Sequence, residues 1–444
     1  GAGARRSGPA ARVGRAVRWR TLKLRKAILD ARAIPINRPA KAAASDDLGI
    51  GPRRDRAIRL YRRVPWGRWR RVMPQTLDQE MTLGPILDTL KPDIIHVHDV
   101  FMLGIGARAA HRAALAGRMV KLVYDAHEYI PGVAVVPARK VAAYADLEAE
   151  FIRDADRVIT VSDPLAGWLQ RDHKLARTPD VVLNAPVEVP TDIEVRGIRD
   201  VVGLEADVPL MVYVGGVNRA RGVGTAVEAL PFLPGVHLAV VARANPVTVE
   251  LGERAAELGV SDRVHFASFV DPELVPAYVR SATIGLSPLL HAPNHDIAVT
   301  NKFCEYIAAG VPIVTSDTPA QADLVRELGL GAVHTAGDVD DFVRAVREVL
   351  ADRDRIAERI EGDAKLRHRF SWAAQAEVIR DVYADLLGEL PKAAWHEGAT
   401  TVSKLIKEPA GTTALLNRLR AQRAGTARPR RDAAGSADDR TAQK

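Results

Sequence analysis

The sequence has one cysteine, few aromatic residues and no long apolar run, and each scarcity narrows the class of protein. Cys304 is the only cysteine among 444 residues. It excludes an internal disulfide, fits a reducing compartment and is expected to be a small core residue. Aromatic residues make up 5% while Ala, Val and Leu dominate, which is typical of parallel sheets covered by helices. No apolar run reaches the ~20 residues of a membrane span, and no apolar stretch follows the basic N-terminus as in a secretory signal. We therefore expect a cytoplasmic protein.

Charge is unevenly distributed along the chain. The net charge is +8, yet residues 1–73 hold 21 Lys and Arg against 4 Asp and Glu, while residues 74–406 hold 33 against 47. Trp19, Trp66 and Trp69 lie among the N-terminal arginines. We therefore expect this region to bind an anionic membrane surface, peripherally at the inner membrane face. Solvation of an ordinary helical surface or tail is the alternative. Nucleic acid ranks last as a partner, because no nucleic-acid-binding module accompanies the basic ends.

The hydrophobic pattern divides the chain into five segments. Residues 1–73 form a basic N-terminal extension with no convincing buried strand, in which residues 18–33 favour a helix. From about residue 88, short apolar runs alternate with helical patterns, which is typical of βαβ units and of an α/β fold. We expect strands at 94–98, 120–124, 158–161, 181–183, 210–214, 236–242, 264–266, 284–287 and 313–315. The remaining boundaries are a first domain at 74–187, a second at 190–370, a helix within 371–390 and a basic, largely disordered tail at 391–444.

The most informative segment is residues 300–317, TNKFCEYIAAGVPIVTSD. Thr300 or Asn301 can cap a helix that ends at Gly310, and a strand follows directly. A helix N-terminus at the end of a parallel sheet offers free N–H groups to phosphate. Glu305, one turn further in, is placed to bind sugar hydroxyls such as those of a ribose. The pattern predicts a site for a nucleoside diphosphate.

A second segment points to the same ligand. A predicted strand ends at Gly215 and Gly216, and Arg219 and Arg221 follow. Glycines allow a ligand to approach the backbone closely, and arginine binds phosphate through its planar fork. The spacing matches neither a phosphate-binding loop of nucleotide triphosphatases nor a dinucleotide fingerprint. A tight turn with surface arginines is the alternative interpretation, but the helix at 301–310 in the same domain favours binding.

In their order along the chain, five such segments resemble glycosyltransferase family 4. These are retaining enzymes with two Rossmann-like domains facing a cleft, the GT-B architecture, and the resemblance covers about residues 91–387. It implies that residues 371–390 cross back to the first domain and that His127, with His98, lies in the catalytic centre. It further implies donor binding by Gly215, Gly216, Arg219, Arg221, Asn301, Lys302 and Glu305. The segments are IIHVHD (94–99), VYDAHE (123–128), VITVS (158–162), VYVGG (212–216, followed by Arg219, Arg221 and Gly222) and NKFCEYIAAG (301–310).

The sequence also departs from the family pattern. Ile297 stands where the family usually carries a second glutamate near the donor sugar. Either Asp296, with His295 beside it, contacts that sugar instead, or backbone N–H groups bind it. The family's partner arginine would fall at Gly216, and we expect Arg219 to take its role. The apolar first strand of the family is not found in residues 1–73. We therefore expect a first domain that is incomplete, or a chain that begins inside a longer domain.

These features predict an enzyme that transfers a sugar from a nucleotide diphosphate sugar to an acceptor with retention. Arginines can supply the positive charge that a cation supplies elsewhere, so we expect no metal and no other cofactor. Two alternatives stay open: a nucleotide-sugar epimerase, and a degenerate transferase-like binding subunit without turnover. The base, the sugar and the acceptor (a glycan, a lipid-linked molecule or a small molecule) are not specified by the sequence.

Overall fold

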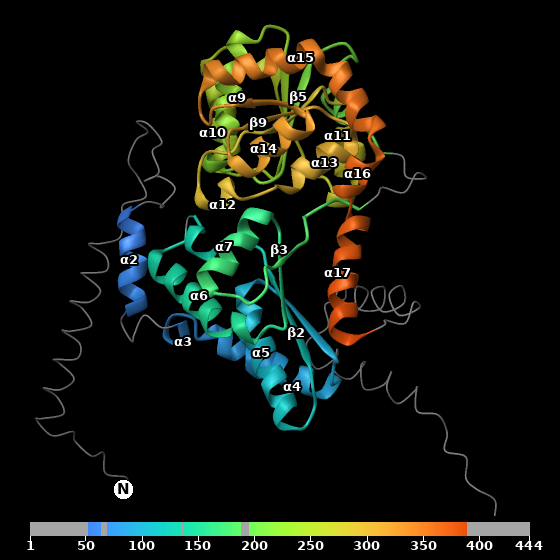
Figure 1. Cartoon of the computed structure of the whole chain (residues 1–444). Helices are drawn as coiled ribbons and strands as arrows, with labels where there is room; N and C mark the ends of the chain where they lie inside the picture. Colours follow the sequence, from blue (N-terminus) through green and yellow to red (C-terminus); the bar gives the residue numbers. More distant parts are fainter. Residues whose placement is uncertain (1–51, 64–68, 135, 188–194, 389–444) are drawn as a thin grey trace, which may run out of the picture. The chain divides into compact units, whose positions relative to one another are not determined.

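The structure is a computed structural model, and it describes residues 52–63, 69–134, 136–187 and 195–388 (Figure 1). The predicted helix at 18–33, Trp19, Trp66 and the tail at 391–444 lie outside these residues. Within the described ranges, no helix combines the length and the hydropathy needed to cross a membrane.

The first domain contains a parallel sheet of four strands in the order β1-β2-β3-β4. Its helices alternate with the strands, and the core is filled by side chains such as Leu103, Leu122 and Leu147, which are fully buried. The elements are α4 (Gln75–Leu90), β1 (Ile94–His98), α5 (Asp99–Leu115), β2 (Lys121–Ala126), η2 (Ile130–Gly132), α6 (Ala138–Phe151), η3 (Ile152–Asp154), β3 (Arg157–Thr160), α7 (Asp163–His173) and β4 (Asp180–Val181).

Two further helices, α2 (Pro52–Arg63) and α3 (Trp69–Val72), pack against α6. Ile58 of α2 joins a buried cluster with residues of α6. The Trp69 side chain is only 1% exposed, and its Nε1–H donates to Glu150 at 2.8 Å. This corrects the predicted boundary at residue 73, because the described part of the N-terminal extension belongs to the first domain. Trp69 is core-forming and is not available for membrane insertion.

The second domain contains a parallel sheet of six strands in the order β10-β9-β8-β5-β6-β7. The chain winds outward in one direction from β5 and then in the other from β8, so the strand order reverses between these two. Ligands of doubly wound sheets bind at the carboxyl ends of the strands beside such a switch point. The strands are β5 (Leu210–Val214), β6 (His237–Val241), β7 (Val264–Ala267), β8 (Ile284–Ser287), β9 (Ile313–Ser316) and β10 (Gly331–His334).

Helices and short 3-10 turns connect these strands and cover the sheet. The α15 helix contacts α9 and β10, whereas α13 contacts α11 and β8; Figure 1 shows α9, α13 and α15 around the sheet. The elements are α8 (Ile198–Val202), η4 (Arg219–Arg221), α9 (Val223–Ala229), η5 (Leu230–Phe232), α10 (Pro246–Glu257), η6 (Ser261–Arg263), η7 (Pro272–Leu274), α11 (Val275–Val279), α12 (Pro293–Asp296), α13 (Asn301–Ala309), α14 (Pro319–Leu328), α15 (Val339–Gly362) and α16 (Ala364–Arg369).

The last described helix, α17 (Trp372–Leu387), lies against the sheet of the first domain. Val382 packs with Val123 and Ile159 in a buried cluster. Asp385 forms an ion pair with Arg157 of β3 at 3.0 Å. The α17 helix therefore packs on the sheet of the first domain.

Candidate active site

The donor-side residues gather at the carboxyl ends of β5 and β8, beside the switch point. Gly215 follows β5 with φ +119°, a conformation that favours glycine. A Cβ atom at Gly216 would meet nothing within 4 Å, so the backbone there is open to a ligand. Gly222 has φ +70°, and a Cβ atom there would overlap the carbonyl oxygen of Pro288. Only glycine lets the loop after β5 lie against the loop after β8.

The α13 helix begins with an N-terminus that its own residues leave uncapped. Thr300 is the N-cap residue but makes no side-chain hydrogen bond to the first-turn N–H groups. Its hydroxyl instead donates to Gln321 Oε1 at 3.0 Å. Asn301, the first helical residue, is exposed. The first turn of α13 can therefore offer backbone N–H groups to an anion.

Two oppositely charged side chains of α13 are buried beside this N-terminus. Lys302 is 7% exposed and Glu305 is 9% exposed. Burial, reinforced by Arg221, lowers the pKa of Lys302 to about 7, and burial raises the pKa of Glu305 to about 7 against the opposing effect of Lys302. Lys302 Nζ lies 5.0 Å from the centroid of the Tyr213 ring. Burying an amino group and a carboxyl group costs free energy, and a polar ligand that hydrogen-bonds to both would offset this cost. Such groups are typical of a binding site.

The two predicted phosphate-binding arginines have different surroundings. Arg221 is close enough to Lys302 and His295 to lower the pKa of both. Arg219 forms an ion pair with Glu250 of α10 at 3.1 Å, and its side chain is 69% exposed. The structure thus brings Arg221 together with the α13 residues, whereas Arg219 pairs with Glu250 at the surface; the phosphate-binding role of Arg219 stays a prediction.

The loop between β8 and α13 is fixed by several polar contacts. His291 lies between two carboxylates, with Nδ1 2.7 Å from Asp296 Oδ1 and Nε2 3.0 Å from Asp317 Oδ1. His295 Nδ1 lies 2.7 Å from the carbonyl oxygen of Leu290, and burial lowers its pKa. Asp296, expected at the sugar, is therefore a partner of His291.

Ile297 has an apolar role in this structure. Its side chain is 4% exposed and belongs to the buried cluster of the first domain, together with residues such as Val97 and Val100. The position where the family usually carries a glutamate thus contributes packing.

The predicted histidines of the first domain meet at one aspartate. His98 ends β1 and lies opposite Asp125 in the register of β1 and β2. Asp125 Oδ2 is 2.8 Å from His98 Nδ1 and 2.8 Å from His127 Nε2. The hydrogen bond to Asp125 raises the pKa of His127, against the effect of burial. His98 and His127, predicted from their strand-end positions, therefore belong to one cluster.

Three members of this cluster, Asp125, His96 and Tyr383, were not among the predicted site residues. Asp125 precedes His127 by two residues, so both side chains would lie on the same face of an extended strand; that spacing was a usable signal. Tyr383, whose hydroxyl lies 2.6 Å from His96 Nδ1, comes from α17. No sequence spacing connects it with residues 287 positions earlier.

The same cluster contains potential metal ligands. Among the described residues, His96, His98 and Asp125 are the one group whose potential ligand atoms lie within 4.8 Å of one another. The two rings stack with centroids 4.6 Å apart and an angle of 17° between their planes. Imidazole lone pairs lie in the ring plane, so those of two nearly parallel rings do not converge on one ion. The arrangement fits a hydrogen-bonded cluster better than a metal centre.

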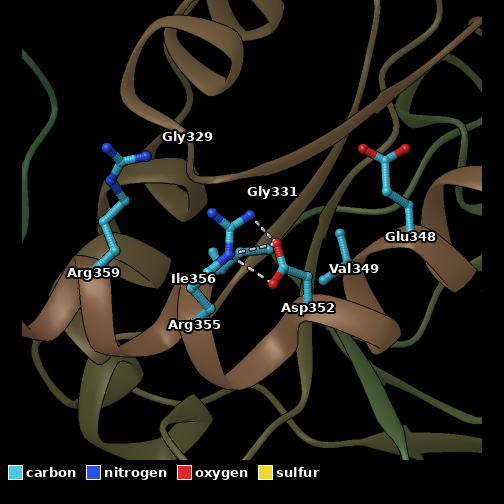
Figure 2. Close-up of a pocket in the computed structure, with 8 residues that line it drawn as sticks. All are labelled: Gly329, Gly331, Glu348, Val349, Asp352, Arg355, Ile356 and Arg359. Atoms are coloured by element: carbon cyan, nitrogen blue, oxygen red, sulfur yellow. Dashed lines mark hydrogen bonds and ion pairs between the residues drawn. The ribbon is translucent and has the colours of Figure 1, made fainter.

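A cavity of about 370 Å³ lies elsewhere in the second domain, between α15 and the start of β10 (Figure 2). It is lined by residues that include Gly331, Asp352 and Arg359. Arg355 points at Asp352 and forms an ion pair with it. Because β10 begins at Gly331, this cavity lies at the amino end of that strand, away from the carboxyl ends that carry the predicted donor residues.

Two family models match this chain. Residues 41–189 match the family described as glycosyltransferase family 4, and residues 208–352 match the one described as glycosyl transferases group 1. The lipopolysaccharide core biosynthesis glycosyltransferase LpsE of Rhizobium meliloti is 30% identical over 189 residues, which are 42% of this chain and 52% of that protein. The D-inositol 3-phosphate glycosyltransferase of Acidothermus cellulolyticus is 27% identical over 337 residues, 70% of this chain and 71% of that protein. The matches to LpsE and some other curated relatives span about half of those proteins' length.

Solved structures show the same architecture. The Anabaena protein Alr3699/HepE, in a crystal structure with UDP-glucose, aligns with a TM-score of 0.55 at 18% identity, over 71% of this chain and 83% of that chain. At this level of identity the likeness shows the fold, two Rossmann-like domains of the GT-B architecture.

Proposed function

We propose that the protein transfers a sugar from a nucleoside diphosphate sugar to an acceptor hydroxyl with retention. It belongs to glycosyltransferase family 4, because residues 41–189 and 208–352 match the models of these transferases. The observation that carries this proposal is the group formed by Arg221, Lys302, Glu305 and the uncapped N-terminus of α13, at the switch point of the second sheet. The structures of Anabaena HepE with UDP and with UDP-glucose support the same class of donor.

The chemistry of the transfer assigns a role to each group. The bond from the anomeric carbon to the diphosphate breaks, and negative charge builds up on the leaving oxygen. Arg221, Lys302 and the first-turn amides of α13 stabilise that charge, and they need no metal ion to do so. Glu305 accepts hydrogen bonds from the ribose hydroxyls. His127 lies beside the donor sugar. The acceptor oxygen attacks from the side of His98 and bonds to the anomeric carbon, and its proton passes to the departing diphosphate. The acceptor is a glycan, a lipid-linked molecule or a small alcohol.

Donor binding is tested by screening nucleoside diphosphate sugars by thermal shift. A donor present at a hundred times its dissociation constant should stabilise the fold by about 2.7 kcal/mol. The Arg221→Ala variant should lose most of this shift. Arg254→Ala serves as the matched control, because Arg254 pairs with Glu228 and Glu257 on the surface of the same domain. A shift that survives in Arg221→Ala would remove this group from the donor site.

Turnover is measured as release of the nucleoside diphosphate in the presence of candidate acceptors. We expect His127→Ala to lower kcat by about 10²-fold or more while changing donor affinity little, because the side chain acts near the sugar. We also expect activity to persist in excess chelator. Activity that is lost with chelator and restored by manganese would assign the protein to a different mechanism.

One observation favours a second candidate function, a subunit that binds nucleotide sugar without transferring it. The family's glutamate near the donor sugar is replaced by Ile297, which is buried in an apolar cluster. Such a subunit would give the thermal shift and no nucleoside diphosphate release with any acceptor, including membrane extract. The two assays together therefore separate the two functions.

A further inference from the structure

His98 is exposed but held on three sides. Its side chain is 62% exposed. Nevertheless it stacks on His96 with ring centroids 4.6 Å apart, meets the His127 ring edge to face at 5.7 Å, and bonds to Asp125 through Nδ1 at 2.8 Å. Exposed side chains without a function rarely have so many fixed contacts, since ordering them costs rotamer entropy. The arrangement is that of a preorganised group.

The shared carboxylate determines which ring nitrogens carry hydrogen. An ionised carboxylate only accepts hydrogen bonds. Burial opposes ionisation of Asp125, but the hydrogen bonds from His127 and His98 outweigh it and lower the pKa of Asp125 to about 2. Asp125 is therefore ionised at neutral pH, and both bonded nitrogens, His98 Nδ1 and His127 Nε2, must be N–H donors.

The nitrogens that remain are His98 Nε2 and His127 Nδ1. Among the described residues, no protein group is hydrogen-bonded to either of them. In the neutral rings both nitrogens carry a lone pair, which accepts a hydrogen bond from a hydroxyl group and repels a phosphate oxygen. One aspartate thus converts two histidines into acceptors for hydroxyl groups at the carboxyl ends of β1 and β2.

A second layer supports this pair from behind. His96 contacts the hydroxyl of Tyr383 at 2.6 Å, and Tyr383 belongs to α17. Burial, followed by the influence of His98, lowers the pKa of His96 to about 4. His96 is thus a neutral ring at physiological pH, and it gives His98 an uncharged surface to stack on. The C-terminal helix thereby contributes to the position of a side chain in the first domain.

We propose that Asp125 is a positioning residue that sets the tautomers of His98 and His127, so that both rings present an unprotonated nitrogen to the hydroxyl groups of the acceptor and the donor sugar. The identity of these hydroxyl groups rests on the proposed function; the tautomers do not. The site so formed selects alcohols and disfavours a phosphate group next to the reacting hydroxyl.

The tautomers are measured on the full chain labelled with ¹⁵N-histidine, by two-bond ¹H–¹⁵N correlation spectra at a pH where the rings are neutral. Signals are assigned with single His→Gln variants. We expect the Nδ1–H tautomer for His98, which is the less common one for an unrestrained histidine, and the Nε2–H tautomer for His127. His98 in the Nε2–H form would overturn the proposal, whatever the activity of the protein.

The Asp125→Asn variant tests the cause. Besides Asp125, the charged groups that act on His127 are Asp99 and Glu128, which also raise its pKa. The neighbouring titratable rings are those of His98 and His96 on β1. Arg221 lowers the pKa of Glu128, against the larger effect of burial. Removing the carboxylate should lower the His127 titration midpoint and abolish the Nδ1–H preference of His98. His237 and His265, which pair with each other in the second domain at 3.0 Å, are internal controls whose signals should not move. An unchanged His127 midpoint would contradict the proposal.

A second variant keeps the test informative if Asp125→Asn is unstable. In His98→Gln the carboxylate is retained, so His127 should keep its Nε2–H tautomer; a change there would assign the tautomer to His98 instead of Asp125. With an active enzyme, Asp125→Asn should lower kcat/KM about 10–100-fold, as expected for misplaced reacting groups. The acid limb of its pH profile should move to lower pH, because His127 then loses its proton earlier. A lower rate with an unmoved limb would mean a merely structural role.

Discussion

At the residue scale, the buried Glu305 carboxyl group of the binding site lowers the folding stability of the ligand-free protein. Burial raises the pKa of its carboxyl group to about 7 from 4.5. Between these two values the folded state retains a proton that the unfolded state has released, so the free energy of unfolding falls as pH rises through this window. Above pH 7 the penalty is complete, and it amounts to about 3 kcal/mol at most.

Glu305→Gln should therefore stabilise the ligand-free protein. We predict that urea denaturation gives a higher free energy of unfolding for the variant at pH 8, by about 1–3 kcal/mol, and a much smaller difference at pH 5. The same variant should bind donor more weakly, because its amide cannot provide a charge-assisted hydrogen bond to the ribose. Equal stability of both proteins at pH 8 would show that the Glu305 carboxylate is not penalised by burial.

Arg221 and Arg219 provide a second prediction at this scale, because they are two positions apart and differ in their partners. Arg221 acts on Lys302, whereas Arg219 pairs with Glu250. In calorimetric titrations with nucleoside diphosphates, Arg221→Ala should raise Kd about tenfold or more, the value of a lost charge-assisted hydrogen bond. Affinity for the bare nucleoside should change less. Arg219→Ala should change neither by more than about twofold; an equal loss in both variants would return Arg219 to the donor site.

At the scale of elements, the position of α13 depends on close packing against β8. A Cβ atom at Gly285 would overlap the ring of Tyr306, whose hydroxyl donates to the carbonyl oxygens of Val212 and Leu286 at 3.0 and 3.2 Å. Tyr306 therefore connects α13 to both strands of the switch point, and only a glycine on β8 leaves space for it.

Gly285→Ala should consequently displace α13. We predict a loss of stability of about 1–3 kcal/mol, the usual effect of overpacking a buried site, together with weaker donor binding. Gly224→Ala is the matched control, since a Cβ atom there would come no closer than 3.9 Å to Leu251. Thermal denaturation and donor titration of the two variants measure the difference. If Gly285→Ala retained wild-type stability and affinity, the geometry of this contact would not control α13.

How far the sequence predicts these elements depends on how local their signals are. The nine expected strands are present, with ends within two residues, because buried parallel strands are continuous apolar runs bounded by turns. The strand β10 (Gly331–His334) was not expected, since four residues that include a glycine at φ +152° carry little of that signal. The α2 and α3 helices were assigned to an extension because their arginines mask the few apolar residues, Ile58 and Trp69, that pack on α6.

The candidate site divides in the same way. The limits of α13 are marked locally by a capping residue at its start and by Gly310 at its end. The sequence therefore places Lys302 and Glu305 in the first turns of this helix, beside its N-terminus. The partners of Arg219 and of His96 are determined by tertiary contacts with α10 and α17, which no local spacing specifies. The sequence therefore predicts which elements carry the site better than it predicts the direction of each side chain.

At the scale of the whole molecule, the two domains contribute different chemistry. The described edge of the first sheet carries His98, Asp99, Asp125, His127 and Glu128, which are acceptors or acids. The switch point of the second sheet carries two basic groups, Arg221 and Lys302, beside the carboxyl group of Glu305. This division matches a transferase that binds a neutral hydroxyl group on one domain and a diphosphate on the other, which is the basis of the function proposed above.

The basic surface of the first domain leads to the remaining prediction. Residues 52–63 form α2, whose exposed arginines are accompanied by Leu60, which is 57% exposed. Arg54 donates a hydrogen bond to the carbonyl oxygen of Val133, and Arg62 donates one to the Asp146 carboxylate. These two arginines therefore do not belong to this surface. The exposed arginines of α2 that have no partner among the described residues are Arg53, Arg56, Arg59 and Arg63.

We predict that this face of α2 binds anionic lipid, since each nearby arginine contributes about 1 kcal/mol at such a surface. Deleting residues 1–73 would remove the buried Ile58 and Trp69, so the appropriate variants are a deletion of residues 1–47, which leaves every described residue in place, and a fourfold Arg→Gln change on α2. In vesicle flotation at low salt, the wild type should bind anionic but not neutral vesicles, and the fourfold variant should bind less.

A matched fourfold Arg→Gln change elsewhere should have no such effect. This control separates an effect of the α2 surface from an effect of the net charge of the protein. If only the deletion abolished binding, the lipid-binding surface would lie in residues 1–47, and no flotation of the wild type would refute membrane binding altogether. The arginines for the matched change are exposed ones of the second domain and α17: Arg326, Arg353, Arg355 and Arg380.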